Sequence, residues 1–211
     1  MNNSWIKITK DMARVLDGVR IEDGNGFLLA QKEGYERFFN RLEDSVKNKS
    51  HVYIIADNDC ELLRQRVADR MSKKAQCEVI SYTYSSCDDD FSYSKLIRQN
   101  ADYNDVLILL SSDGMDKKLL RAADLANDLG MKVVTFSACS SINSLSHKGD
   151  INFYVNTKDA WVAESNYMCI FNLILNGFEG KEQKNADIFD EIIIPEQNLQ
   201  KELSSLTYLG F

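Results

Sequence analysis

Short apolar runs recur through the middle of the chain and predict buried β-strands. Five runs, rich in β-branched and aromatic residues, cover 51–56, 77–82, 105–110, 132–136 and 151–155. Each has the length of an ordinary strand. Their nearly continuous hydrophobicity, in place of strict alternation, is typical of parallel strands that are covered on both faces.

Between most of these runs the apolar positions follow the helical period. One helical face is formed by five residues spaced alternately by four and three positions: Met115, Leu119, Ala122, Ala126 and Leu129. Its alanines would let this helix pack closely on a sheet. Further helices are predicted at 4–17, 27–47 and 159–176. The sequence Asp-Gly-Asn-Gly at 23–26 separates the first two of them.

The alternation of strands and helices predicts a doubly wound α/β fold with a five-stranded parallel sheet of the flavodoxin-like kind. We expect residues 1–47 to form N-terminal helices that serve oligomerisation, and residues 48–178 to form the α/β core. Residues 179–211 are too apolar for a simple disordered tail, and we expect them to pack on the core or on a neighbouring subunit. Ligands of such folds bind outside the carboxyl ends of the strands, where helices begin.

The acidic composition argues against some classes of partner. The 211 residues carry a formal net charge of −7, and the sequence pI is about 4.9. No basic excess is available to displace counterions from nucleic acid, so we expect no nucleic-acid partner. The longest apolar runs are far shorter than the roughly 20 residues that span a bilayer, so no membrane segment is expected.

The cysteines indicate a reducing compartment. The five cysteines are scattered without any CxxC pair, and no signal peptide is recognisable. We therefore expect reduced thiols, a cytoplasmic location, no zinc site and no cofactor. The acidic run Asp88–Asp90 is expected to be a solvated turn, because adjacent carboxylates converge poorly on one ion.

The turn at 111–116, Ser-Ser-Asp-Gly-Met-Asp, lies between a predicted strand and a predicted helix. Proteins often hold phosphate at such a place, yet this turn carries two carboxylates. The order of elements and residues 111–155 resemble the sugar isomerase (SIS) domain superfamily, and within it the phosphoheptose isomerases most closely. The resemblance covers roughly residues 27–176. It implies a phosphosugar crevice, a homo-oligomer (dimer or tetramer) and isomerisation of sedoheptulose 7-phosphate.

The turns that would line the crevice depart from the family's pattern. The family's central turn reads Ser-Thr-Ser-Gly-Asn-Ser, and its turn after the first strand reads Gly-Asn-Gly-Gly-Ser. Ser111, Gly114 and Asn58 match these motifs, whereas three hydroxyls that would donate to phosphate are replaced by carboxylates. The resemblance assigns seven residues to the crevice: Asn58, Glu61, Ser111, Ser112, Asp113, Gly114 and Asp116.

The family's catalytic groups have no counterpart when the sequences are aligned without gaps. Catalysis in the family transfers a proton through an enediol, with a Glu on the first core helix and a His on the final helix. The four polar positions of the family fall on Met71, Val67, Ala163 and Phe171, and none of these side chains can act as an acid or a base. A shift of one residue would place Glu164 and Asn172 at the Gln and His positions, but it breaks the match at Ala160. We assign no catalytic residue; the candidates for a rearranged site are Glu164, His147 and Asp59.

The acidic residues Glu61, Asp113 and Asp116 are expected to face the position of the phosphate. One carboxylate about 4 Å from a phosphate charge costs roughly 4 kcal/mol at an effective dielectric near 20. Asp113 and Asp116 also suit helix N-capping, in which case they satisfy free N–H groups themselves.

Three functions remain open. The first is a catalytically degenerate SIS-fold protein that acts as a regulatory or interaction subunit through a protein partner. The second is an active sedoheptulose 7-phosphate isomerase with a rearranged site. The third is a sensor of an uncharged or cationic sugar, which an acidic turn would favour.

Overall fold

The structure is a computed structural model that describes residues 16, 18–84, 92–138 and 143–179. The helix predicted at 4–17, apart from Leu16, lies outside the described residues. The acidic run at 88–90 and the tail from residue 180 onward also lie outside them.

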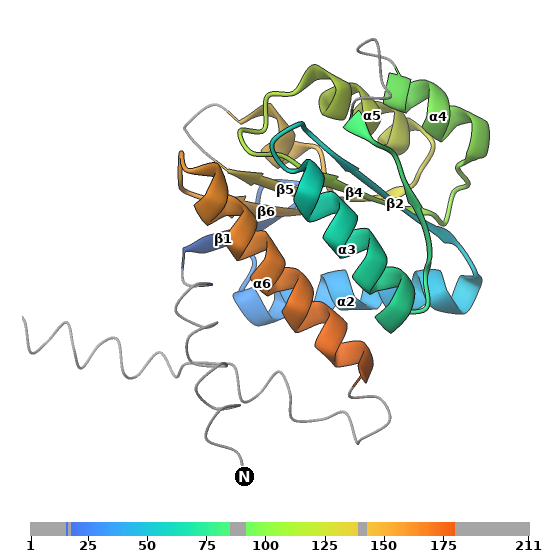
Figure 1. The fold of residues 1–211 in the computed structure, drawn as a ribbon, viewed down its shortest axis with the longest axis horizontal. Coiled ribbons are helices and arrows are strands. Elements are labelled where there is room, and N and C mark those ends of the chain that lie inside the picture. The colour runs from blue at the N-terminus through green and yellow to red at the C-terminus, as the bar shows by residue number, and fades with distance from the viewer. Residues whose placement is uncertain (1–15, 17, 85–91, 139–142, 180–211) are drawn as a thin grey trace, which may run out of the picture.

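Six strands form one sheet in the order β1-β6-β5-β4-β2-β3 (Figure 1). Their bounds are β1 (Val19–Asp23), β2 (His51–Ala56), β3 (Glu78–Ser81), β4 (Val106–Leu110), β5 (Lys132–Ala138) and β6 (Ile151–Val155). Strands β2 to β6 are mutually parallel, which confirms the five predicted strands and their direction.

Strand β1 is the one strand that the sequence pattern did not predict. It pairs antiparallel with β6 at the edge of the sheet, so the sheet is mixed rather than wholly parallel. Val19 and Ile21 are buried while Arg20 between them is exposed. This five-residue alternation is typical of a half-covered edge strand, and it is too short to stand out beside the continuous runs.

Five helices and a 3₁₀ turn complete the described chain. Their bounds are α2 (Gln31–Asn48), α3 (Glu61–Lys74), α4 (Ser92–Asn100), α5 (Lys117–Asp128), η2 (Ser144–His147) and α6 (Ala160–Glu179). Helix α2 begins later than predicted because a turn continues to Phe27, whose carbonyl accepts from Asp23 N at 2.9 Å. Leu28, which lies within the helix predicted at 27–47, precedes α2 and is 67% exposed.

The helices cover the two faces of the sheet as a doubly wound fold requires (Figure 1). Helices α2, α3 and α6 pack with Ile54, Ile108 and Phe136 on one face. Helices α4 and α5 pack with Tyr53 and Leu107 on the other. Successive residues of a strand thus point alternately into the two hydrophobic cores, which explains why the strands are hydrophobic throughout.

The aromatic residues of α2 serve this chain's own core. Phe38 is fully buried, with its ring centroid 5.7 Å from that of Phe136. Tyr35 stacks on Phe153 at 6.1 Å, whereas Phe27 remains exposed. Tyr35 and Phe38 are therefore engaged within the chain, and oligomerisation through residues 1–47 stays a prediction. Among the described residues, none of the helices is long and apolar enough to cross a bilayer.

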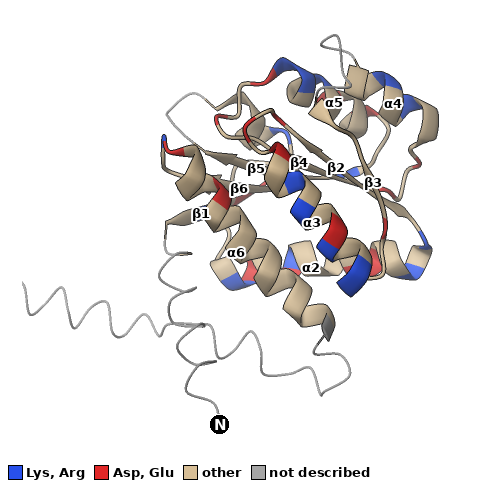
Figure 2. Ribbon diagram, in the orientation of Figure 1, with Lys and Arg blue, Asp and Glu red and all other residues tan. Residues whose placement is uncertain are grey.

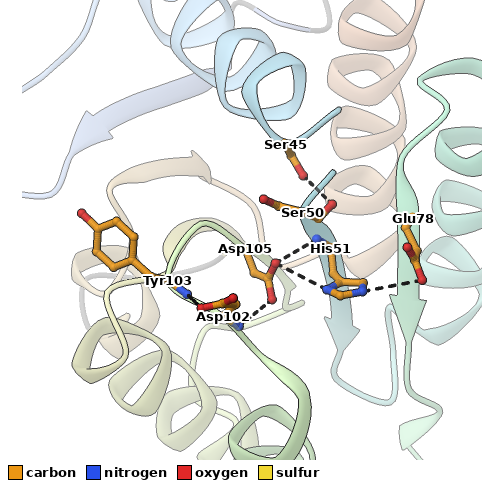
Figure 3. Close-up of polar contacts among 7 residues, drawn as sticks. All are labelled: Ser45, Ser50, His51, Glu78, Asp102, Tyr103 and Asp105. Atoms are coloured by element: carbon orange, nitrogen blue, oxygen red, sulfur yellow. Dashed lines mark hydrogen bonds and ion pairs between the residues drawn. The ribbon is translucent and has the colours of Figure 1, made fainter. Parts of the chain in front are cut away.

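The buried carboxylate of Asp105 links residues at the amino ends of the parallel strands (Figure 3). Asp105 Oδ1 accepts from His51 N at 2.8 Å, and Asp105 Oδ2 accepts from Asp102 N at 2.7 Å. The His51 ring lies between Asp105 and Glu78, at 3.5 Å and 3.6 Å. These contacts join the starts of β2, β3 and β4, so His51 has a structural place rather than a catalytic one.

Candidate functional site

The candidate site lies where the winding of the sheet reverses. Neighbouring strands β2 and β4 are parallel, but β2 leads into α3 on one face and β4 leads into α5 on the opposite face. The loops after the two strands therefore separate and leave a crevice outside the carboxyl ends, the usual ligand position in open α/β sheets. Asp57 follows β2, and Ser111 follows β4.

Asp57 occupies the centre of this crevice and accepts four hydrogen bonds. Its Oδ2 accepts from Ser112 N at 2.6 Å, from Ser111 Oγ at 2.9 Å and from Ser112 Oγ at 3.1 Å. Its Oδ1 accepts from Cys60 N at 2.9 Å. The donors come from both loops, so a side chain of the protein's own takes the place that a small anion would take between them.

Burial and hydrogen bonding act on Asp57 in opposite directions. Burial raises the pKa of this carboxyl above its usual range, while the bonds from Ser112, Cys60 and Ser111 lower it. The Cys60 thiol beside it has a pKa raised first by burial and then by the charges of Asp57 and Glu164. Cys60 is therefore an inert buried thiol, and the crevice carries a negative potential.

An open cavity of about 230 Å³ lies beside Asp57. Its lining consists of Asp57, Asn58, Asp59, Tyr84, Ser112, Asp113, Met115 and Asp116. Four of these eight residues carry carboxylates, and no lysine or arginine is among the described residues that line it. The cavity thus favours a cationic or neutral group over a phosphate.

The central turn keeps its backbone shape through two specific contacts. Gly114 has φ of +72°, the left-handed region that favours glycine, and its N–H donates to Ser111 Oγ at 2.8 Å. A Cβ atom at this position would lie 1.9 Å from Asn143 Oδ1. Leu145 N donates to the Gly114 carbonyl at 3.1 Å, so η2 closes over the turn.

The two aspartates of the turn have different tasks. Asp116 is the N-cap of α5, and its Oδ1 accepts from Lys118 N at 2.8 Å and from Leu119 N at 3.1 Å. This confirms the capping interpretation for Asp116. Its Oδ2 also accepts from Tyr84 Oη at 3.1 Å. Asp113 caps only its own turn, where its Oδ1 accepts from Met115 N at 2.8 Å, and its side chain is exposed.

Glu61 does not line the cavity, which corrects its expected orientation toward the ligand. The side chain forms two hydrogen bonds with Arg64, from Nε at 2.9 Å and from Nη2 at 2.6 Å. Arg64 is itself buried and also donates to Ser81 Oγ. The bidentate ion pair holds Glu61 toward β3 and neutralises it. Asp59 and Asp57 provide the carboxylates that line this side of the crevice.

The three candidates for acid–base chemistry lie at different distances from the crevice. Asp59 Oδ2 accepts from Ser112 Oγ at 3.1 Å and lines the cavity. Glu164, on the first turns of α6, has a pKa raised by burial and by the charges of Asp57 and Asp59, while Arg66 lowers it. His147 is exposed at the end of η2 and does not line the cavity.

The apolar side chains at the family's catalytic positions belong to the core. Val67, Met71, Ala163 and Phe171 are all buried against the face of the sheet that α3 and α6 cover. The ring centroid of Phe171 is 4.8 Å from that of Phe136. Within the described residues, no group of three or more His, Cys, Asp or Glu side chains is arranged to hold a metal ion.

Comparison with known proteins identifies the architecture. No family model and no curated protein matches the chain. A phosphoheptose isomerase from Neisseria gonorrhoeae superposes with a TM-score of 0.60 at 16% identity, over 68% of this chain and 84% of that one. A phosphoheptose isomerase from Francisella tularensis gives 0.62 at 13% identity, over 84% and 95%. The chain has an SIS-like fold.

A third solved structure shares the fold. The Vibrio vulnificus NanR protein, solved in complex with ManNAc-6P, superposes on this SIS-like chain with a TM-score of 0.62 at 12% identity. The match covers 95% of this chain and 69% of NanR. At such identities the likeness concerns the fold alone, so the chemistry must be argued from the residues present.

Sequence reasoning located the crevice but missed its central residue. Asn58, Ser111, Ser112, Asp113, Gly114 and Asp116 lie together around the switch between β2 and β4. Asp57 was passed over because it matched no family motif. A usable signal existed, since it is the first polar residue after a continuous apolar strand, where the carboxyl ends of parallel strands meet.

Proposed function

We propose that this SIS-like chain is a catalytically degenerate subunit that acts through a protein partner. The observation that carries the proposal is the Asp57 carboxylate, which accepts from Ser111, from Ser112 and from Cys60 N. A sugar phosphate would need these donors, and it would meet a buried negative charge in their place.

The electrostatic cost supports exclusion of phosphate. Each carboxylate about 4 Å from a phosphate charge costs roughly 4 kcal/mol at an effective dielectric near 20, or about three decades of affinity. Asp57, Asp59 and Asp113 line the cavity without a paired lysine or arginine in its described wall. The buried positions of Met71 and Phe171 agree with the absence of the family's acid and base.

The test is thermal stabilisation by sedoheptulose 7-phosphate. We expect no rise in melting temperature for the wild type at millimolar ligand. The variant Asp57→Ser/Asp59→Ser should show a measurable rise, because the turn and its N–H groups then face an anion. Asp128→Ser, which removes an exposed carboxylate at the far end of α5, serves as the control for a loss of negative charge away from the crevice and should behave as the wild type. Tight binding by the wild type would overturn the proposal.

The runner-up function is a phosphosugar isomerase with a rearranged site. The observation that favours it is Glu164, a carboxyl whose pKa is raised by burial and by the neighbouring Asp57 and Asp59. Such a group can hold a proton closer to neutrality than an ordinary glutamate. This function requires turnover of sedoheptulose 7-phosphate that is lost in Glu164→Gln, and absence of turnover in the wild type excludes it.

A sensor of cationic sugars is the third function, and the acidic lining of the cavity favours it. Amino sugars would place an ammonium among Asp59, Asp113 and Asp116. Stabilisation by an amino sugar, but not by its N-acetyl form, would establish this function in place of the first.

A further inference from the structure

An exposed apolar rim borders the acidic crevice. Trp161 is 79% exposed and Leu62 is 63% exposed, and Val162 and Met115 are each 45% exposed. Leu62 lies in the first turn of α3, and Trp161 and Val162 lie in the first turn of α6. Because α3 and α6 both follow parallel strands, their first turns lie at the same carboxyl edge of the sheet as the cavity.

Helices α3 and α6, which carry three of these residues in their first turns, lie side by side (Figure 1). Arg70 Nη1 on α3 donates to Asn172 Oδ1 on α6, which joins the two helices two turns below. Arg66 and Glu164 interact electrostatically between that contact and the rim. The polar contacts are thus made inside the helix pair, and the large apolar side chains remain outside at its end. Large exposed apolar residues gathered near one cleft are typical of an interaction site.

The charges beside the rim define what can dock there. Asp59, Asp113 and Asp116 line the cavity next to Met115, and Glu164 lies one turn from Trp161. Figure 2 marks acidic segments near the start of α6 and in the loops at this end of the sheet. A partner must therefore combine apolar side chains for the rim with a cation for the cavity.

A second copy of this chain fits the surface poorly. A two-fold interface centred on the rim would apply this surface to itself and bring the two acidic cavities together. Like charges brought together in this way oppose association. The net charge of −7 gives no compensating basic surface on average.

We propose that the rim formed by Leu62, Met115, Trp161 and Val162 docks a segment of a different protein that carries a lysine or arginine between apolar residues, with the cation entering the acidic cavity. This inference rests on the proposed function and names the surface and the partner's chemistry. Trp161 packs on the apolar side chains of the segment, and Asp59 and Asp113 accept hydrogen bonds from its cation.

The experiment uses Trp161 as its own reporter. The chain has two tryptophans, so full-length Trp5→Phe leaves Trp161 as the single tryptophan, which can be excited selectively at wavelengths that tyrosine does not absorb. We expect solvent-exposed emission and ready quenching by acrylamide at all protein concentrations. Shielding that appears with rising concentration would mean that a second copy covers the rim. Shielding that is independent of concentration would mean that residues 180–211 or another part of the chain covers it; either result overturns the proposal.

Display selection of random peptides against this variant then supplies the probe. We expect enriched peptides to place lysine or arginine beside aromatic or aliphatic residues and to shift the emission of Trp161. Leu62→Ser and Asp113→Asn should each weaken binding of the selected peptides at least tenfold. Their matched controls, Leu28→Ser and Asp128→Asn, change equally exposed residues away from the rim and should leave affinity unchanged.

Failure of this inference differs from failure of the proposed function. Peptides that lack a cation, that bind all variants equally, or that are not enriched at all contradict the docking surface. Binding of sedoheptulose 7-phosphate to the same protein contradicts the proposed function instead. If the protein binds neither phosphosugar nor basic peptide, the exclusion of phosphate still holds, and the docking surface is rejected.

Discussion

One buried aspartate lies at the amino ends of the parallel strands and another lies at their carboxyl ends, yet the two aspartates have different surroundings. At the amino edge, Asp105 accepts from His51 N and Asp102 N, which begin strands or lead into them (Figure 3). At the carboxyl ends of the strands, Asp57 accepts from two loops that also border an open cavity. The first aspartate completes the backbone of the fold, whereas the second occupies groups that a ligand could use.

The difference teaches that the chemistry of a buried carboxylate depends on what could replace it. The Asp105 side chain is buried, and the cavity described above is lined by Asp57 and not by Asp105. Water or an anion can enter the cavity and take the place of Asp57. Four substitutions and conditions test this contrast, from the largest expected effect to the smallest.

Asp105→Ala should lower the free energy of unfolding by about 3 kcal/mol, because two backbone N–H groups lose a buried, charged acceptor. Urea denaturation measures the loss. Asp128→Ala, which removes an exposed carboxylate, should change stability by less than about 0.5 kcal/mol. A loss below about 1 kcal/mol for Asp105→Ala would mean that water reaches the amino edge as well.

Gly114→Ala should cost about 2 kcal/mol, because the residue has a left-handed φ and its Cβ would meet Asn143 Oδ1. Gly26→Ala is the matched control, since Gly26 has φ of +79° but open space around the Cβ position. It should cost about 1 kcal/mol, the strain of the backbone alone. Equal losses in the two variants would show that Asn143 moves aside freely.

Asp57→Ala should cost only about 1 kcal/mol, less than the same change at Asp105, because Ser112 lines the cavity together with Asp57, and water in the cavity can reach Ser112 N. Inorganic phosphate should stabilise this variant more than the wild type. Comparison of denaturation curves with and without phosphate measures both effects. A loss as large as that of Asp105→Ala would place Asp57 among purely structural residues.

The smallest effect concerns pH. Burial raises the pKa of Asp57, so its contribution to stability is fully present below the ordinary value of 3.8 and is lost as pH rises through the raised pKa. Asp57→Asn does not titrate at this position. The melting temperature of the wild type minus that of the variant should therefore fall as pH rises from about 4 and then level off. A difference that grows with pH would mean that the hydrogen bonds outweigh burial.

Most of the fold could be predicted from the sequence, because the two hydrophobic cores require apolar residues on both faces of the central strands. Strands β2 and β4 were predicted almost residue for residue, since both faces of each strand are buried. Strand β1 was not predicted, because only alternate residues of an edge strand need to be apolar and its apolar residues therefore form no continuous run. The start of α2 was misplaced because Phe27 and Leu28 are hydrophobic without being buried.

The site was less predictable because side-chain partners decide it. Asn58, Ser111 and Gly114 were located by motif and lie where expected, at the ends of β2 and β4. Glu61 was misread because its partner Arg64 was not considered, although a spacing of three residues on a helix is typical of such pairs. Asp57 could be recognised as the internal acceptor only when β2 and β4 were placed side by side.

The most direct test of the account is a calorimetric titration of sedoheptulose 7-phosphate into wild-type protein and into Asp57→Ala. The account predicts no binding to the wild type at millimolar ligand and detectable binding to the variant, because the donors of Ser111 and Ser112 are then released. Micromolar binding to the wild type would contradict it. In that case the ligand displaces Asp57 from its hydrogen-bond donors, and a phosphosugar isomerase becomes the favoured function.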